Sequence, residues 1–135
     1  MVHQHPPRCT FSRVAEWPKY LVVGLAALQL GDAIGNELVP RRYLTAHLDH
    51  LGVPNRLRPA LPVIKVAGSA GLILGIKSPY LGALTAACLV GFYAAAVVFH
   101  VRADDNPVVW LPAIAFGATA AASLVTFYLP ATADA

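Results

Sequence analysis

The stretch that decides the fold is YLGALTAACLVGFYAAAVVFH, residues 80–100. It contains no acidic residue, lysine or arginine, and its only strongly polar side chains lie near its ends. A helix that rises about 1.5 Å per residue needs about 20 apolar residues to cross a hydrocarbon core of about 30 Å. The stretch is therefore typical of a transmembrane helix.

Three further stretches have a similar length and composition: Tyr20–Val39, Leu57–Ile76 and Val108–Leu129. The chain is 57% apolar and 13% charged, with a mean hydropathy of +0.59. A soluble domain of 135 residues could not hide four such segments from water. We predict an all-α membrane protein, an antiparallel four-helix transmembrane bundle over residues 19–130. A mobile N-terminal tail (1–18) and a C-terminal tail (131–135) flank it.

The connection between the first two spans contains a second kind of helical pattern. Its ring-bearing and aliphatic residues recur at helical spacing, at Tyr43, Leu44, His47, Leu48 and Leu51. Gly52 and Pro54 follow, as expected at a helix end. We predict a short amphipathic helix on the membrane surface between the first and second transmembrane helices.

Small residues predict where helices approach each other closely. Gly31 and Gly35 form one Gly-x-x-x-Gly motif, and Gly71 and Gly75 form another. The turn at residues 77–79 is short, so the second and third spans should form a tight antiparallel hairpin.

The fourth span has its own boundary signals. Asp105 or Asn106 can cap its first turn. Trp110 near its start and Tyr128 near its end are expected to anchor it at the two membrane interfaces.

Ionisable residues inside the spans fall at matching depths. Asp32 and Lys65 each lie eight residues, about 12 Å, from the same side of the membrane in an up-down-up-down arrangement. Tyr93 lies about 10 Å from that side, and His100 lies near the surface. Because an unpaired charge at this depth costs about 2.5–3.5 kcal/mol, we predict an Asp32–Lys65 ion pair or a proton-sharing neutral pair.

Each span presents its polar residues as one stripe. The stripes are Gln29, Asp32 and Asn36; Lys65 and Ser69; Tyr93 and His100; and, nearer the opposite surface, Thr119, Ser123 and Thr126. Such groups should face a common interior rather than lipid.

This polar set has two interpretations. It can simply hold the helices together, or it can line a pocket. In the second case Asp32, Lys65 and His100 are the catalytic candidates, and the substrate-binding candidates are Gln29, Asn36, Ser69, Tyr93 and Trp110. Histidine is the side-chain type used most often to move protons near neutral pH, so His100 could move protons to or from the surface. Its alternative role is to bond the last carbonyls of its helix.

Other classes of site have little support. We expect no metal site: His3, His5 and Cys9 lie in the tail, while His47, Asp49 and His50 are interpreted as surface-helix residues. No Cys-x-x-Cys motif is present, so a dithiol redox centre is unsupported. No nucleic-acid-binding motif accompanies the net charge of +3.

The chain from Leu48 onward resembles the DoxX-like family of small four-helix membrane proteins. The resembling segments are LDHLGVP (48–54), PVIKVAG (62–68), GLILG (71–75), YAAA (93–96) and HVR (100–102). The resemblance implies a four-helix membrane fold. Similar members have been linked to thiosulfate–quinone electron transfer, to thiol-redox complexes and, among distant relatives, to receptor assembly.

Our leading hypothesis is an intramembrane pocket for a lipophilic small molecule, quinone-like or another metabolite, used in redox or proton-transfer chemistry. An enzyme of this kind would be an oxidoreductase-like or acid/base membrane enzyme, or its small subunit. The alternative is a non-catalytic membrane subunit or assembly factor. We expect a multi-pass protein of a bacterial cytoplasmic membrane, alone or in a homo-oligomer or larger complex.

Overall fold

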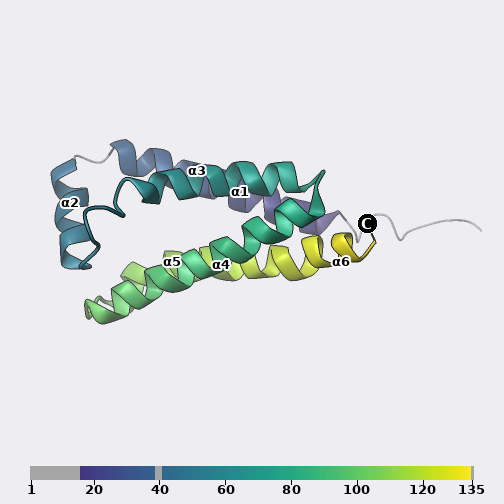
Figure 1. Ribbon diagram of the computed structural model, residues 1–135. Coiled ribbons are helices and arrows are strands. Elements are labelled where there is room, and N and C mark those ends of the chain that lie inside the picture. Colours follow the sequence, from purple (N-terminus) through teal and green to yellow (C-terminus); the bar gives the residue numbers. More distant parts are fainter. Residues whose placement is uncertain (1–15, 39–40, 135) are drawn as a thin grey trace, which may run out of the picture.

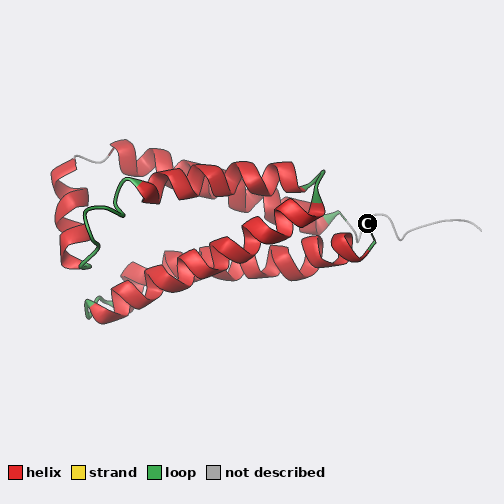
Figure 2. Cartoon of the chain, in the orientation of Figure 1, coloured by secondary structure: helices red, strands yellow, loops and turns green. Residues whose placement is uncertain are grey.

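The computed structural model describes residues 16–38 and 41–134, and its regular elements there are all helical. They are α1 (Trp17–Leu38), α2 (Arg41–His50), α3 (Ala60–Gly75), α4 (Pro79–Arg102), α5 (Pro107–Ser123), the π-helix η1 (Leu124–Tyr128) and α6 (Leu129–Ala133) (Figure 1, Figure 2). The prediction of an all-α protein is confirmed for these residues. Most of the predicted N-terminal tail lies outside them.

The four long helices form two pairs. Helix α1 packs against α3 and α5, and α4 also packs against α3 and α5. The α1–α3 pair and the α4–α5 pair lie close together near α6 and diverge toward α2, which lies across the open end (Figure 1). The two helix pairs are therefore farther apart at the end near α2 than at the end near α6 (Figure 1).

Two of the described helical stretches are long and apolar enough to cross a membrane. They are Pro79–Arg102, with 24 residues, and Pro107–Ala133, with 27 residues. Helix α1 passes the same test only together with α2, as a pair bent by 108°. Among the described residues there are thus two or three candidate spans.

Helix α3 is shorter than the sequence pattern predicted. It is apolar, but it has 16 residues and begins at Ala60 rather than Leu57. The residues before it form turns, and the Arg58 guanidinium there donates to the Val53 carbonyl at 3.1 Å. The residues from Leu57 to Pro59, which the hydropathy pattern assigns to the span, therefore belong to a turn that precedes α3.

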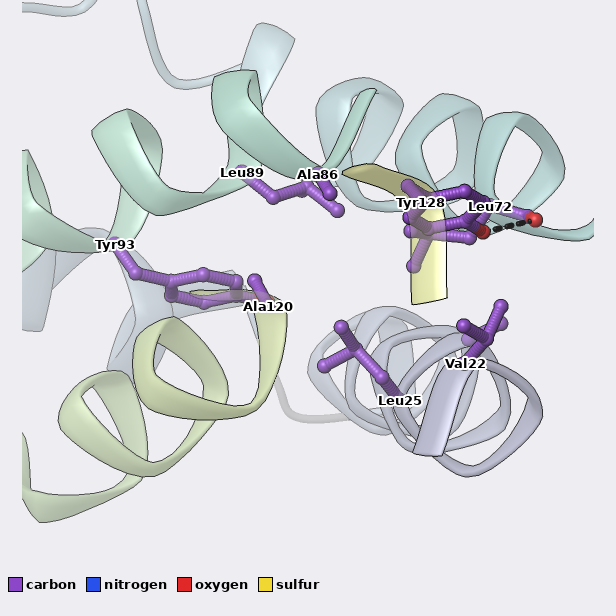
Figure 3. Packing of buried hydrophobic residues seen from close by; sticks show 9 residues of the cluster. Val22, Leu25, Leu72, Ala86, Leu89, Tyr93, Ala120 and Tyr128 are labelled. Carbon is purple, nitrogen blue, oxygen red and sulfur yellow. Dashed lines mark hydrogen bonds between the residues drawn. The ribbon is translucent and has the colours of Figure 1, made fainter. Parts of the chain in front are cut away.

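Tyr128 occupies the core at the closed end (Figure 3). Its side chain is fully buried, and its hydroxyl donates to the Leu72 carbonyl at 2.6 Å. A Cβ at Gly82 would lie 2.0 Å from the Tyr128 ring, so this glycine makes room for the ring. The expectation that Tyr128 is an interfacial anchor is wrong, because the ring fills the space beside glycines of α3 and α4.

The two Gly-x-x-x-Gly motifs have different surroundings. A Cβ on Gly75 would lie 2.3 Å from the Gly82 Cα, so α3 and α4 touch through their backbones as predicted. A Cβ on Gly31 or Gly35 would meet no atom within 4 Å. The motif in α1 therefore makes no close helix contact among the described residues.

Replacing Tyr128 by phenylalanine tests the buried hydroxyl. We expect Tyr128→Phe to lower the free energy of unfolding by about 0.5–1.5 kcal/mol, the usual net contribution of a hydrogen bond. Tyr80→Phe is the matched control, because the Tyr80 hydroxyl is exposed and lies 3.4 Å from its acceptor. Thermal unfolding in detergent, followed by circular dichroism, should separate the two variants; equal melting temperatures would contradict the role given to Tyr128.

Candidate functional site

A cavity of about 500 Å³ lies between the helix pairs at the α2 end. Most of its lining side chains are apolar, from α2, α3, α4, α5 and the segment between α2 and α3. Five of the eight candidate residues line it: Asp32, Asn36, Lys65, Tyr93 and His100. The fold thus brings together most of the polar set that the sequence singled out.

Asp32 and Lys65 form the charged part of the cavity wall. The Lys65 amino group donates to the Asp32 carboxyl group, which confirms the contact between the two side chains that was predicted from their depths. The Lys65 side chain is 16% exposed and that of Asp32 is 37% exposed. The carboxylate therefore keeps accessible surface while it lies against a partly buried cation.

Ser69 and Gln29 lie behind the cavity wall rather than on it. The Ser69 hydroxyl is 3.0 Å from the Ala26 carbonyl oxygen and 2.9 Å from that of Lys65. Gln29 is fully buried and accepts a hydrogen bond from the Tyr93 hydroxyl at 3.2 Å. These contacts fasten α1 to α3 and α4 and so support the residues in front of them.

Tyr93 is held by an aromatic neighbour as well as by Gln29. Its ring stacks on that of Phe116 from α5, with a distance of 5.3 Å between centroids. Both residues line the cavity. Gln29 and Phe116 therefore fix the position of Tyr93, and the hydroxyl group donates its hydrogen to Gln29.

The candidate Trp110 on α5 and the threonines of α5 and η1 lie apart from the cavity. Trp110 is half-buried in the first turns of α5 but does not line the cavity. Thr119 and Thr126 donate to carbonyls of their own helical turns at 2.7 Å. Asn106, rather than Asp105, caps α5, accepting from the Val108 N–H at 3.0 Å.

His100 is bonded to the turn after its helix instead of to the last helical carbonyls. Its Nδ1 lies 2.7 Å from Asp105 Oδ2, and Asp105 Oδ1 lies 2.7 Å from Nε2 of His50. One carboxylate therefore links α4 to α2. The hydrogen bond to His100 is the main reason why the pKa of Asp105 lies below its ordinary value of 3.8, and His50 lowers it further.

Several residues at this end of the molecule have contacts that the sequence does not predict. The sequence pattern marks Asp105 only as a candidate helix cap, and its partner His50 lies 55 residues away. Arg58 also lines the cavity and pairs with Asp49 on α2. The His47 ring of α2 lies 5.7 Å from that of His100, measured between centroids. No local sequence pattern connects these residues, because their contacts depend on where α2 lies relative to the long helices.

The lowered pKa of Asp105 predicts a pH-dependent contribution to stability. The unfolded chain has the higher pKa, about 3.9, so the ionised carboxylate stabilises the folded state above that pH. The contribution is lost as the pH falls through the lower folded-state pKa. Asp105→Asn should therefore be less stable than the parent near neutral pH, and the difference should vanish once the pH lies below the folded-state pKa of Asp105. Melting temperatures across this range measure it, and a constant difference would contradict the linkage.

The arrangement suits a molecule that is mainly apolar and has a polar end. Aromatic and aliphatic side chains can hold the apolar part, while the ion pair, Asn36 and His100 face its polar atoms. Within the described ranges, no group of three or more His, Cys, Asp and Glu side chains is placed to hold a metal ion.

The chain was compared with protein families, curated proteins and solved structures. No curated protein and no solved structure matches it significantly. The model of the DoxX-like family matches residues 20–123, which include all eight candidate residues. Because this match covers most of the chain and the helices are strongly apolar, the chain is an integral membrane protein that belongs to the DoxX-like family.

Proposed function

We propose that the protein binds a lipophilic small molecule inside the membrane and takes part in proton-transfer or redox chemistry on its polar end. The observation that supports this most is the cavity, in which an ion pair and a histidine share an otherwise apolar wall. A quinone or a related metabolite has the required combination of an apolar body and polar oxygen atoms.

The proposal places α1, α3, α4 and α5 across the membrane as an antiparallel four-helix bundle, with α2 at its surface. Helices α1 and α3 support this because they also expose large apolar side chains: Leu28 is 64% exposed and Val63 is 63% exposed. Helix α3 would cover about 24 Å at 1.5 Å per residue, which spans most of a hydrocarbon core. The cavity then lies within the leaflet nearest α2.

The residues have distinct proposed roles. Asp32 accepts or returns a proton, and Lys65 stabilises its charged form and can donate a hydrogen bond to a ligand oxygen. His100 exchanges protons between the bound molecule and the surface. Asn36 and Tyr93 orient the polar end, while Gln29 and Ser69 hold the wall in place.

A second function has specific support. The Asp32–Lys65 pair is already complete, and Ser69 joins α3 to an α1 carbonyl. A non-catalytic membrane subunit or assembly factor would need no more than this, because buried polar contacts between helices can serve to fix their packing.

Filling the cavity tests the ligand site without changing an ionisable group. Ala96 lines the cavity, whereas Ala94 lies two residues away on an exposed face of the same helix. We would measure the thermal stability of the protein in nanodiscs with the short-chain quinone decylubiquinone and, separately, with its reduced quinol form. A ligand at 100 times its Kd stabilises by about 2.7 kcal/mol. We expect stabilisation of the parent and of Ala94→Phe, but little for Ala96→Phe.

Two results would contradict the proposal that a quinone-like ligand binds in this cavity. Equal stabilisation of both variants would show that the probe binds elsewhere or only partitions into lipid. No stabilisation of the parent by either the quinone or the quinol would remove the support for a quinone-like ligand and favour the subunit function.

A further inference from the structure

The contact between His100 and Asp105 determines which ring nitrogen can carry the hydrogen. An ionised carboxylate only accepts hydrogen bonds, so the histidine nitrogen that contacts it must be protonated. Nδ1 of His100 and Nε2 of His50 are the two nitrogens in contact with Asp105, each at 2.7 Å. The two neutral histidines should therefore be opposite tautomers, with the hydrogen on Nδ1 of His100 and on Nε2 of His50.

The same geometry leaves the other nitrogen of His100 available. Nε2 lies on the far side of the ring from Nδ1 and has no hydrogen-bond partner among the described residues. The ring lines the cavity, and only 12% of the side chain is exposed. In the tautomer set by Asp105, Nε2 carries a lone pair.

We propose that Asp105 is a positioning residue, which holds His100 so that its Nε2 accepts a hydrogen bond from a hydroxyl group of the bound molecule. This rests on the proposed ligand site and narrows its substrate class to lipophilic molecules with a hydroxyl group, such as phenols or quinols. A carbonyl oxygen has no hydrogen to donate to Nε2. When the hydroxyl is deprotonated, its proton passes to Nε2 and the resulting imidazolium stays paired with the Asp105 carboxylate.

Other charged and titratable groups of the neighbouring elements line the same cavity as this histidine or contact its hydrogen-bond partner. They are His47 and His50 of α2, Arg58 of the following segment, Asp32 of α1, Lys65 of α3, and Tyr93 of its own helix. Of these, only His50 shares a direct hydrogen-bond partner with His100. The tautomer is therefore set by Asp105 and not by the more distant charges.

The tautomers can be measured directly. We would label histidine with ¹⁵N in the full chain in nanodiscs and record the ring nitrogen signals by NMR, above the pH at which the rings are protonated. His50→Gln and His100→Gln assign the signals. We expect protonated Nδ1 in His100 and protonated Nε2 in His50. In Asp105→Asn one carboxylate oxygen becomes an amide N–H donor, so one of the two histidines should change tautomer.

Asp104→Asn is the matched control, because Asp104 is exposed and forms no ion pair among the described residues. It should leave both tautomers unchanged. Protonated Nε2 in His100 of the parent would overturn the proposal, and so would an unchanged pair of signals in Asp105→Asn.

The substrate class is tested with 4-heptylphenol and its methyl ether as probes. We expect the phenol to bind at least tenfold more tightly than the ether and to shift the Nε2 signal of His100. Equal binding of the two, or tighter binding of the ether, would overturn recognition through the hydroxyl. If neither probe binds although the tautomers are as expected, the ligand recognition is refuted, and Asp105 orients a histidine that serves only the helix contacts.

Discussion

Asp32→Asn is expected to destabilise the protein by about 2–4 kcal/mol. The substitution keeps the shape of the side chain but leaves Lys65, whose side chain is 16% exposed, without its counter-charge. Removing one member of a buried ion pair costs about 3–5 kcal/mol, and the partial exposure of Asp32 should reduce this. Chemical or thermal unfolding in mild detergent measures the change, with the exposed Asp104→Asn as the control.

The double variant Asp32→Leu with Lys65→Leu separates structure from function. Removing both charges together often costs less than removing one, so most of the lost stability should return. If the pair also binds a ligand, the double variant should regain stability but should not retain the ligand. A double variant that is as unstable as Asp32→Asn would show that the two side chains do not act as an isolated pair.

Gly75→Ala is expected to have an effect of similar size by a different mechanism. The new Cβ would lie 2.3 Å from the Gly82 Cα and 2.8 Å from its nitrogen. These are backbone atoms, so a change of side-chain rotamer cannot relieve the clash. Helices α3 and α4 would have to move apart. Overpacking usually costs about 1–3 kcal/mol, and a backbone clash should lie at or above the upper end.

Gly31→Ala provides the control for this substitution. It makes the same change in a helix, but its Cβ would meet no atom within 4 Å. We expect its melting temperature to equal or exceed that of the parent, because alanine favours helix more than glycine does. A similar loss of stability in both variants would contradict the backbone contact between α3 and α4.

The contact between Asp32 and Lys65 could be predicted from the sequence because helix geometry fixes the depth of each side chain. Rise per residue and helical spacing place these side chains at one level, and the cost of an unpaired charge in lipid selects their pairing. The same reasoning brought Asn36, Tyr93 and His100 to one end of the protein. They line the cavity with the ion pair.

The features that the sequence did not predict depend on contacts between distant segments. Tyr128 resembles an interfacial anchor by position, yet it fills space beside Gly75 and Gly82. Asp105 resembles a helix cap, yet it bonds His50 from another helix. Trp110 lies near the right depth but outside the cavity lining. Periodicity gives the face and depth of a residue within its helix, but it does not give the position of a short helix such as α2 across the others.

The central claim is that the cavity holds a lipophilic molecule. We would purify the parent, Ala96→Phe and Ala94→Phe in nanodiscs and identify the small molecules that co-purify by mass spectrometry. We expect one lipophilic, oxygen-bearing molecule to be retained by the parent and by Ala94→Phe, and lost from Ala96→Phe. The same bulk lipids in all three samples, with no specific molecule in the parent, would contradict the claim and direct the search toward protein partners.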